Sequence, residues 1–345
     1  MIPAAPASQQ HTGTSSDSSR PASAWQQLWR QAERDPRRLL ARLGLEHEAA
    51  RLSDTAAAGF ITRVPQGFIN RMRRGDLNDP LLRQVLPVVE EEAIVPGFAL
   101  DAVGDGPAKK ATGVIQKYQG RALLVTTGSC AIHCRYCFRR HFDYAGENAA
   151  RGGWAEAVAA IAADPSIDEV ILSGGDPLSL TTPKLAELTD ALATIPHIRR
   201  LRIHSRLPVV LPERVDPELL SWLAALPWPV AFVIHANHAN EFDAQVFAAL
   251  AALRSTGVQL LNQAVLLAGV NDSVDALCAL SECSFAAGVL PYYLHQLDRV
   301  QGVAHFEVSD QRALALVEGL RARLSGYLVP QLVREIAGDT SKRPL

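Results

Sequence analysis

Three of the five cysteines lie within eight consecutive positions, in the pattern C-x3-C-x2-C. They are Cys130, Cys134 and Cys137, in the segment CAIHCRYC. A single loop with this spacing can place three thiolates around one metal cluster. A [4Fe–4S] cluster has four irons, so three thiolates leave one iron without a protein ligand and able to bind a small molecule. The spacing therefore indicates an iron–sulfur centre with an open coordination position.

A zinc knuckle is the alternative interpretation of this loop. Structural zinc needs four ligands within tetrahedral reach, and His133 and His141 are the nearby candidates for the fourth ligand. Zinc explains neither the position of the loop after a predicted strand nor the motifs further along the chain, so the cluster is favoured. Cys278 and Cys283 have apolar neighbours in a helical pattern and are predicted to be core thiols.

A second motif, SGGDP, covers residues 173–177 at the end of a predicted strand. Gly174 and Gly175 have no side chain and allow the backbone to approach a ligand closely, and Asp176 follows them. A Gly-Gly pair alone occurs at least as often in a plain turn. The motif therefore gains weight only together with the cysteine loop.

The hydrophobic pattern predicts the elements that must position these motifs. Short apolar and β-branched runs indicate six strands, and amphipathic segments between them indicate helices. This alternation implies parallel strands with right-handed crossovers, as a partial (βα)6 barrel or as an open doubly wound sheet. In both folds the functional groups gather at the C-terminal ends of the strands, where the motifs fall. The predicted strands are 122–127, 169–173, 200–204, 231–236, 259–266 and 289–294, and the predicted helices are 152–163, 183–193, 217–226, 241–256 and 274–287.

Composition limits the class of protein. The chain has 345 residues, 48% of them hydrophobic, and a formal net charge of -2. This balance argues against a disordered chain and a generic polyanion binder, so no nucleic-acid partner is expected. The sequence shows no apolar run of about 18 residues and no secretory signal, which predicts a cytoplasmic protein without a membrane partner. The predicted regions are a disordered tail at 1–24, a helical region at 25–112, an α/β core at 113–330 and a C-terminal segment at 331–345.

The cysteine loop resembles that of the radical S-adenosylmethionine (SAM) superfamily, whose signature has an aromatic residue, here Tyr136, before the last cysteine. The resemblance implies a partial (βα)6 TIM-type radical SAM barrel. It also implies that the open iron chelates SAM, and that an electron from a reducing donor releases a 5′-deoxyadenosyl radical. By the same resemblance, Gly174, Gly175 and Asp176 hold the amino group of the SAM methionine.

Segments between about residue 60 and residue 345 are similar to the lysine 2,3-aminomutase family, and most similar to the subgroup that makes β-lysine for translation elongation factor P. This resemblance implies an isomerase that converts L-lysine to β-lysine, with a functional link to the ligase that modifies elongation factor P. It also implies that His235, Gln263 and Arg206 line the SAM pocket. The segments are NDPLLRQ (78–84), KYQGR (117–121), RLPVVLPER (206–214), HANHANE (235–241), PYYLHQLD (291–298) and GVAHF (302–306).

Moving an amino group between neighbouring carbons requires a group that carries nitrogen through a radical, and pyridoxal 5′-phosphate (PLP) does this as an imine. The family has its imine-forming lysine near the chain end, where Lys342 is the lysine of the segment AGDTSKRPL. Without the resemblance, a lysine at this position would be interpreted as a solvated tail residue. Arg121 and Lys117 match basic residues that contact PLP in the family.

Three further residues match substrate positions of the family. Arg139 matches the arginine that pairs with the substrate α-carboxylate, to which a planar guanidinium is suited. Asp298 and Glu335 match two acids that meet the ε-ammonium of lysine, although the family has aspartate at the second position. A glutamate-specific enzyme would instead need a cation or an amide there, so the two acids favour lysine.

Three alternatives remain open at this point. The chain could be a radical SAM aminomutase for another amino acid such as glutamate, or a radical SAM enzyme that uses no PLP. It could also be a zinc-stabilised interaction protein without catalytic activity.

Overall fold

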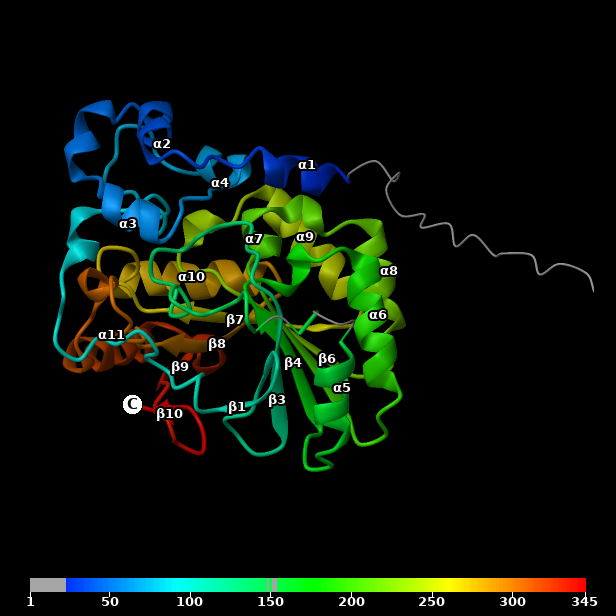
Figure 1. Ribbon diagram of the computed structural model, residues 1–345. Coiled ribbons are helices and arrows are strands. Elements are labelled where there is room, and N and C mark those ends of the chain that lie inside the picture. Colours follow the sequence, from blue (N-terminus) through cyan, green and yellow to red (C-terminus); the bar gives the residue numbers. More distant parts are fainter. Residues whose placement is uncertain (1–22, 148, 151–153) are drawn as a thin grey trace, which may run out of the picture.

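The strands form one sheet in which neighbours in space are neighbours in sequence (Figure 1). The computed structural model describes residues 23–147, 149–150 and 154–345, and the sheet runs from β1 to β10 in order. β3 to β9 are parallel, whereas β1 and β2 at one edge and β10 at the other are antiparallel to their neighbours. The strands are β1 (Lys109–Ala111), β2 (Val114–Ile115), β3 (Arg121–Thr127), β4 (Glu169–Gly174), β5 (Arg200–Ser205), β6 (Val230–Ile234), β7 (Gln259–Val265), β8 (Leu290–His295), β9 (Gln331–Arg334) and β10 (Arg343–Pro344).

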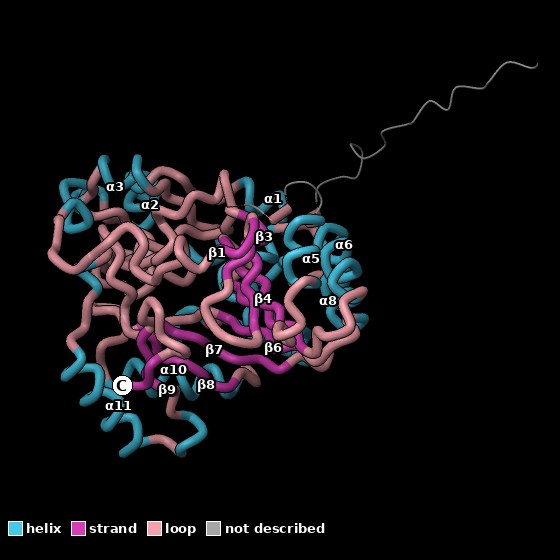
Figure 2. Tube along the Cα trace, turned by 60° about the horizontal axis from the view of Figure 1, so that its bottom comes forward, coloured by secondary structure: helices cyan, strands magenta, loops and turns pink. Residues whose placement is uncertain are grey.

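The strand order decides between the two predicted folds. A doubly wound sheet reverses its strand order at a switch point, whereas the order from β3 to β8 never reverses. Right-handed crossovers then place the connecting helices on one face, and Figure 2 shows them along the outside of the strands. The predicted partial (βα)6 barrel is therefore confirmed. Its outer helices are α5 (Ala155–Ala162), α6 (Thr182–Ala193), α8 (Pro217–Ala225), α9 (Ala244–Ser255), α10 (Val274–Ala286) and α11 (Asp310–Arg323), and the short α7 (Leu207–Val210) follows β5.

Four of these helices begin at a polar residue that caps the first turn. The side chain of Asp216 accepts a hydrogen bond from the backbone of Leu219 at the start of α8, and Asp243 does the same for α9. Ser273 and Ser309 cap α10 and α11 in the same way. Each cap satisfies a backbone N–H that the helix leaves free, so the sequence fixes where these helices start.

The N-terminal region packs beside the barrel rather than forming part of it, and Figure 1 shows its helices grouped together in blue. Its buried residues, such as Trp25 and Phe68, belong to the same hydrophobic core as the barrel strands. Backbone hydrogen bonds from Ala99 to Arg299 and from Gln301 to Ala99 tie its last part to the loop after β8. The helices are α1 (Ala24–Arg30), α2 (Pro36–Leu43), α3 (Asp54–Gly59) and α4 (Gln66–Asn70), with 3-10 turns η1 (Glu46–Arg51) and η2 (Val89–Glu92).

The six predicted strands and five predicted helices all correspond to observed elements, with limits that differ by a few residues. The pattern did not predict α11 or the seventh parallel strand, β9. Residues 1–22 of the predicted tail and residues 152–153 of the first predicted helix lie outside the described residues. The limits of the four predicted regions stay predictions.

Within the described ranges, none of the helices combines the length and the apolar character that crossing a membrane requires.

Gly174 gives a test of how tightly the end of β4 packs. Its φ is +120°, and a Cβ atom built there would lie 2.6 Å from the carbonyl oxygen of Thr127. We expect Gly174→Ala to lower the free energy of unfolding by about 3 kcal/mol, because backbone strain and overpacking add. Gly257→Ala is the matched control, since its φ is +89° and nothing lies within 4 Å of the added atom. Equal losses for the two variants in denaturant unfolding of the cofactor-free protein would contradict the close packing.

Candidate active site

The predicted site residues gather where the parallel strands end. Parallel strands point their C-terminal ends in one direction, so the loops that follow them meet at one mouth of the barrel. The cysteine loop follows β3, and Gly174 is the last residue of β4. The other positions after strand ends are Arg206 (β5), His235 (β6), Asp298 (β8) and Glu335 (β9), and Gln263 lies within β7.

The cysteine loop presents three free thiols that are partly exposed, Cys130, Cys134 and Cys137. They are close enough to influence one another electrostatically. Burial, followed by the charge of Cys134, raises the pKa of Cys137 to about 11. Burial, followed by the charge of Asp176 and then by the other two thiolates, raises the pKa of Cys130 well above its usual value. Metal binding at this loop must therefore displace protons from the thiols, as thiolate ligation generally does.

The two histidines of the zinc alternative are turned to other partners. The Nδ1 atom of His133 lies 2.6 Å from the carbonyl oxygen of Ile61, and the ring stacks on Phe60. The Nε2 atom of His141 lies 3.2 Å from the carbonyl oxygen of Gln301. Among the residues that the structure describes, no three His, Cys, Asp or Glu side chains converge to hold a single metal ion. A zinc knuckle needs a fourth ligand beside the three thiols, and both nearby histidines contact other groups, so three thiolates fit a cluster with one open iron better.

The glycine motif packs directly against the backbone that leads into the cysteine loop. A Cβ atom on Gly175 would lie 2.5 Å from the carbonyl oxygen of Ser129, the residue before Cys130. Only glycine fits such an approach without moving the backbone. The motif therefore sets the position of the start of the loop, and contact with SAM through Gly174 and Gly175 stays a prediction.

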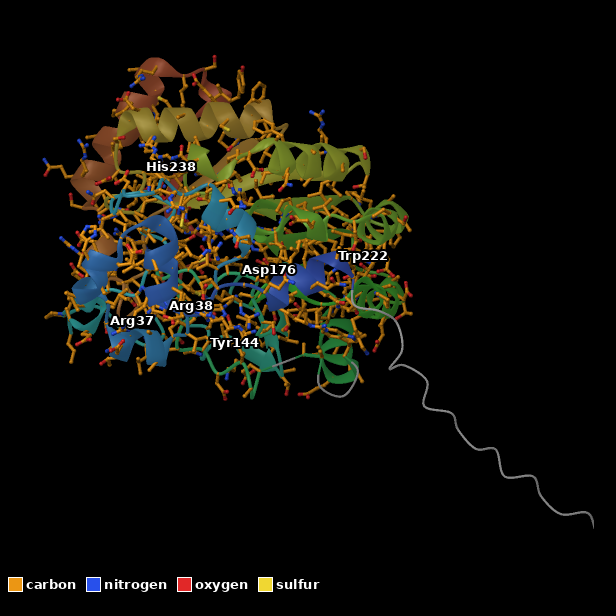
Figure 3. The ribbon with its side chains drawn as sticks, turned by 90° about the horizontal axis from the view of Figure 1, so that it is seen from above. Arg37, Arg38, Tyr144, Asp176, Trp222 and His238 are labelled. Atoms are coloured by element: carbon orange, nitrogen blue, oxygen red, sulfur yellow. The ribbon has the colours of Figure 1, made fainter. Side chains whose placement is uncertain are left out.

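Asp176, labelled in Figure 3, is buried, and its carboxylate is engaged by the protein. It accepts hydrogen bonds from the Ser205 hydroxyl (2.8 Å) and from the backbone N–H groups of Leu178 (3.0 Å), Arg206 (2.7 Å) and Leu207 (3.2 Å). Burial raises its pKa to about 6, although these bonds oppose the shift. The carboxylate joins the ends of β4 and β5, and its predicted contact with a cofactor stays a prediction.

Arg206 reaches from the end of β5 to the cysteine loop. Its guanidinium donates to the Sγ of Cys134 (2.7 Å) and to the hydroxyl of Tyr136. The second terminal nitrogen donates to Gln84 (2.8 Å) and to Glu241 (2.9 Å). The side chain thus links the barrel, the N-terminal region and the loop at one buried point.

His235 and Gln263 lie side by side at the ends of β6 and β7. The Nδ1 atom of His235 is 3.2 Å from the carbonyl oxygen of Gln263, and its ring centroid is 5.4 Å from that of His204. Burial, followed by the charge of Arg206, lowers the pKa of His235 to about 4. The ring is therefore neutral at physiological pH, and it can form hydrogen bonds without carrying a positive charge.

Four of the predicted residues are joined in one run of opposite charges, with Asp105 as an added member. Asp105 accepts from the Nε of Arg139 (2.7 Å) and pairs with the Nζ of Lys117 (2.7 Å). Lys117 is also 3.4 Å from Glu335, whose other oxygen is 2.6 Å from the Nζ of Lys342. These five residues are called the charge run below: Arg139, Asp105, Lys117, Glu335 and Lys342. They connect the cysteine loop, the segment before β3 and the C-terminal segment.

Burial and neighbouring charges set the ionisation of the acids. Burial alone would raise the pKa of Asp105, but Arg139 and Lys117 lower it below its usual value. Burial is likewise outweighed at Glu335, where Lys342 and Lys117 lower the pKa. Asp298 behaves differently, because burial raises its pKa to about 7 despite the opposing charge of Lys342. Near neutral pH Asp298 is therefore present in both forms.

Arg121 lies at the start of β3, and its guanidinium carbon is 4.5 Å from the ring centroid of Tyr118. Sequence reasoning missed Tyr118 and Asp105 as parts of the site. Asp105 stands in an irregular segment, AVGDGPAKK, where no periodic pattern or spaced motif marks it. The signal that could have found it is chemical, because the buried Arg139 and the partly buried Lys117 require an acid.

Sequence comparisons agree with this geometry. The family model described as the Radical SAM superfamily matches residues 124–280. L-lysine 2,3-aminomutase of Escherichia coli K12 is 48% identical over 312 residues, which cover 90% of this chain and 91% of that protein. The enzyme of the same name from Haemophilus influenzae is 44% identical over 319 residues, covering 92% and 94% of the two chains. That of Buchnera aphidicola is 41% identical over 283 residues, covering 82% and 83%.

The family implies a [4Fe–4S] cluster and SAM, in agreement with the donors found at the cysteine loop. The agreement is not limited to the cysteine loop. The chain also has the barrel expected of the superfamily, and the similarity to the Escherichia coli enzyme covers 90% of its residues. The chain therefore belongs to the L-lysine 2,3-aminomutase family of radical SAM enzymes.

Proposed function

We propose that this protein converts L-lysine to β-lysine by radical migration of the amino group to the neighbouring carbon, using a [4Fe–4S] cluster, SAM and PLP. The observation that supports the proposal is the charge run, in which Arg139, a suitable partner for a carboxylate, and Glu335, a suitable partner for an ammonium group, belong to one mostly buried set of ion pairs. A diamino acid such as lysine presents these two charges at its two ends. The names of the similar proteins support the same substrate.

Cys130, Cys134 and Cys137 are the proposed ligands of three irons, with SAM on the fourth. The cluster and SAM together supply a 5′-deoxyadenosyl radical when an external reducing donor provides an electron. Gly174, Gly175 and Asp176 are the proposed contacts of the SAM methionine. His235, Gln263 and Arg206 are proposed to line the rest of the SAM pocket.

Arg139 is the proposed partner of the substrate α-carboxylate. In the present structure Asp105 occupies its Nε, while one terminal nitrogen makes only a long 3.4 Å contact with the Ser173 hydroxyl. A bidentate pair with a carboxylate uses the terminal nitrogens, which Asp105 leaves available. Asp105 thus holds the guanidinium in place and leaves its fork for the substrate.

Asp298 and Glu335 are the proposed partners of the substrate ε-ammonium. Glu335 pairs with the ammonium group of Lys342 at 2.6 Å, which supports its assignment as a partner for a primary ammonium group. A glutamate side chain would meet two acids and be repelled, so the site disfavours that alternative substrate.

Lys342 is the proposed attachment point of PLP, with Arg121 and Lys117 as phosphate contacts. PLP supplies a π-system that can accept the unpaired electron. Glu335 contacts the Lys342 Nζ directly at 2.6 Å and would hold this amine in place for PLP. We further propose that the protein acts in the cytoplasm and supplies β-lysine to the ligase that modifies elongation factor P.

The proposal is tested by incubating the anaerobically reconstituted protein with L-lysine, SAM, PLP and dithionite, followed by identification of the product. We expect β-lysine, with about four irons and four sulfides bound per chain. Parallel incubations with L-glutamate are expected to give no β-amino acid. Conversion of glutamate instead of lysine, or one zinc per chain in place of iron, would contradict the proposal.

Lys342→Ala tests the role of PLP. We expect the variant to lose both the imine absorption band and the aminomutase activity, because the substitution removes the amine to which PLP is proposed to attach. Borohydride reduction followed by peptide mapping measures the covalent attachment directly. Lys110→Ala, an exposed lysine on β1, serves as the control and is expected to behave like the wild type. Retention of the imine band and of activity in Lys342→Ala would support a different lysine or a PLP-independent reaction.

Asp298 provides a test based on pH. Its pKa is raised to about 7, so its ionised form, which attracts an ammonium group, increases as the pH rises through that value. We expect kcat/KM for lysine to rise with an inflection near this pKa at saturating SAM. In Asp298→Asn the inflection is expected to disappear. KM is expected to increase about 10- to 100-fold, because the substitution removes one charge-assisted hydrogen bond to the substrate.

Glu307→Gln is the control for this experiment, because Glu307 forms a surface pair with Arg299, and such pairs contribute little. An Asp298→Asn enzyme with the KM and the pH profile of the wild type would remove Asp298 from the substrate site.

A further inference from the structure

Two arginines, Arg135 and Arg140, lie on either side of Cys137 in the sequence and share one acid from the N-terminal region. Glu91 in η2 receives both donors of a bidentate pair from Arg135, at 2.8 Å from Nε and 2.6 Å from NH2. Arg140 donates to the same carboxylate at 2.6 Å. The three side chains are 0% (Arg135), 1% (Glu91) and 5% (Arg140) exposed, so this arginine–glutamate triad lies almost entirely out of water.

The remaining donors of the triad reach backbone carbonyls on both sides of the loop. Arg135 donates to Ala56 (3.0 Å) in α3 and to Phe60 (2.5 Å) after it. Arg140 donates to the carbonyl of Arg135 and to that of Gly302, both at 3.0 Å. The guanidinium carbons of both arginines lie over the Phe60 ring, at 5.2 Å and 5.4 Å from its centroid. The triad therefore joins the N-terminal helices, the cysteine loop and the loop after β8.

Backbone hydrogen bonds run along the same contact. The N–H of Arg135 donates to the carbonyl of Gln84 (2.8 Å), and that of His133 donates to the carbonyl of Arg63 (3.0 Å). Residues 128–147 themselves contain neither helix nor strand. The position of the thiols thus depends on what the loop is attached to, rather than on its own secondary structure.

Glu91 is central to the contact between the cysteine loop and the N-terminal region, because it is the acid that pairs with both arginines of the triad. Burying a charge is costly unless it is paired, and removal of one partner leaves the others uncompensated. Without Glu91, two guanidinium groups would face each other in the interior beside the loop. They could regain water or counter-charges only if the loop or η2 moved.

We propose that Glu91 is a positioning residue for the iron–sulfur cluster: by pairing with both Arg135 and Arg140 it fixes the cysteine loop in a geometry that would hold the cluster and leave one iron open to SAM. This inference rests on the proposed assignment of Cys130, Cys134 and Cys137 as cluster ligands. In this proposal the N-terminal region contributes to the site by holding the cysteine loop in place.

The test compares Glu91→Gln, which keeps the size and removes the charge, with Glu90→Gln, an exposed neighbour in the same turn. Both full-length proteins are reconstituted anaerobically with iron and sulfide. The measurements are iron and sulfide per chain, the rate at which a chelator bleaches the sulfur-to-iron absorption, and the electron paramagnetic resonance spectrum of the reduced cluster with and without SAM. We expect Glu91→Gln to lose its cluster about tenfold faster than the wild type, and the spectral change caused by SAM to be weakened. Glu90→Gln is expected to match the wild type.

The spectral readout separates positioning from simple stability, because a structural residue would lower the thermal midpoint without changing the spectrum of clusters that remain bound. Bleaching rates and SAM-induced spectra equal to those of the wild type would overturn the inference. A wild type that takes up no cluster would instead overturn the proposed function, so the two failures are distinguishable.

Arg140→Gln decides the matter if Glu91→Gln does not fold. This variant keeps the Arg135–Glu91 pair and removes the second link. We expect a thermal midpoint of the cofactor-free protein close to that of the wild type, with cluster loss several-fold faster. An unchanged rate of loss would also overturn the inference.

Discussion

A buried charge must have a partner, and this constraint organises the active site before any substrate arrives. Arg139 and Lys117 are both held by Asp105, and Lys342 is held by Glu335. Each ion is mostly removed from water, so none can be left alone without a large loss of stability. The carboxylate and the ammonium groups of a substrate would meet side chains of opposite charge that these pairs already hold in place. The proposed preference for a diamino acid rests on the same rule.

The same rule operates on the other side of the cysteine loop. Arg135, Arg139 and Arg140 lie within six residues, yet they point to different partners. Arg135 and Arg140 turn to Glu91 in the N-terminal region, whereas Arg139 turns to Asp105 beside the barrel. The loop is therefore held between two acids that belong to neither the loop nor the barrel strands. A segment without regular structure acquires a defined position in this way, which is what a radical centre requires of its ligands.

The sequence predicts those parts of the molecule that depend on local pattern. The strands from β3 to β8 have five to seven residues and carry apolar residues either in a run, as in β6 (VAFVI), or in alternation, as in β5 (RLRIHS). The cysteine spacing is a motif, so both could be found. Strand β9 has four residues, QLVR, of which two are buried, and this is too short and too polar to stand out. Asp105 has no pattern at all, since its role comes from two cations that approach it from elsewhere in the chain. Lys342 could be selected only through the family resemblance.

The missed strand explains how a lysine near the chain end reaches the mouth of the barrel. β9 pairs with β8 in parallel, which continues the barrel by one strand and aims its C-terminal end at the site. β10 then returns antiparallel to β9, with Arg343 opposite Arg334. The next pair in this register is Lys342 with Glu335, and cross-strand neighbours of opposite charge attract each other. The ion pair between them is therefore a consequence of sheet register, and the seventh strand is the element that brings the proposed PLP lysine to the site.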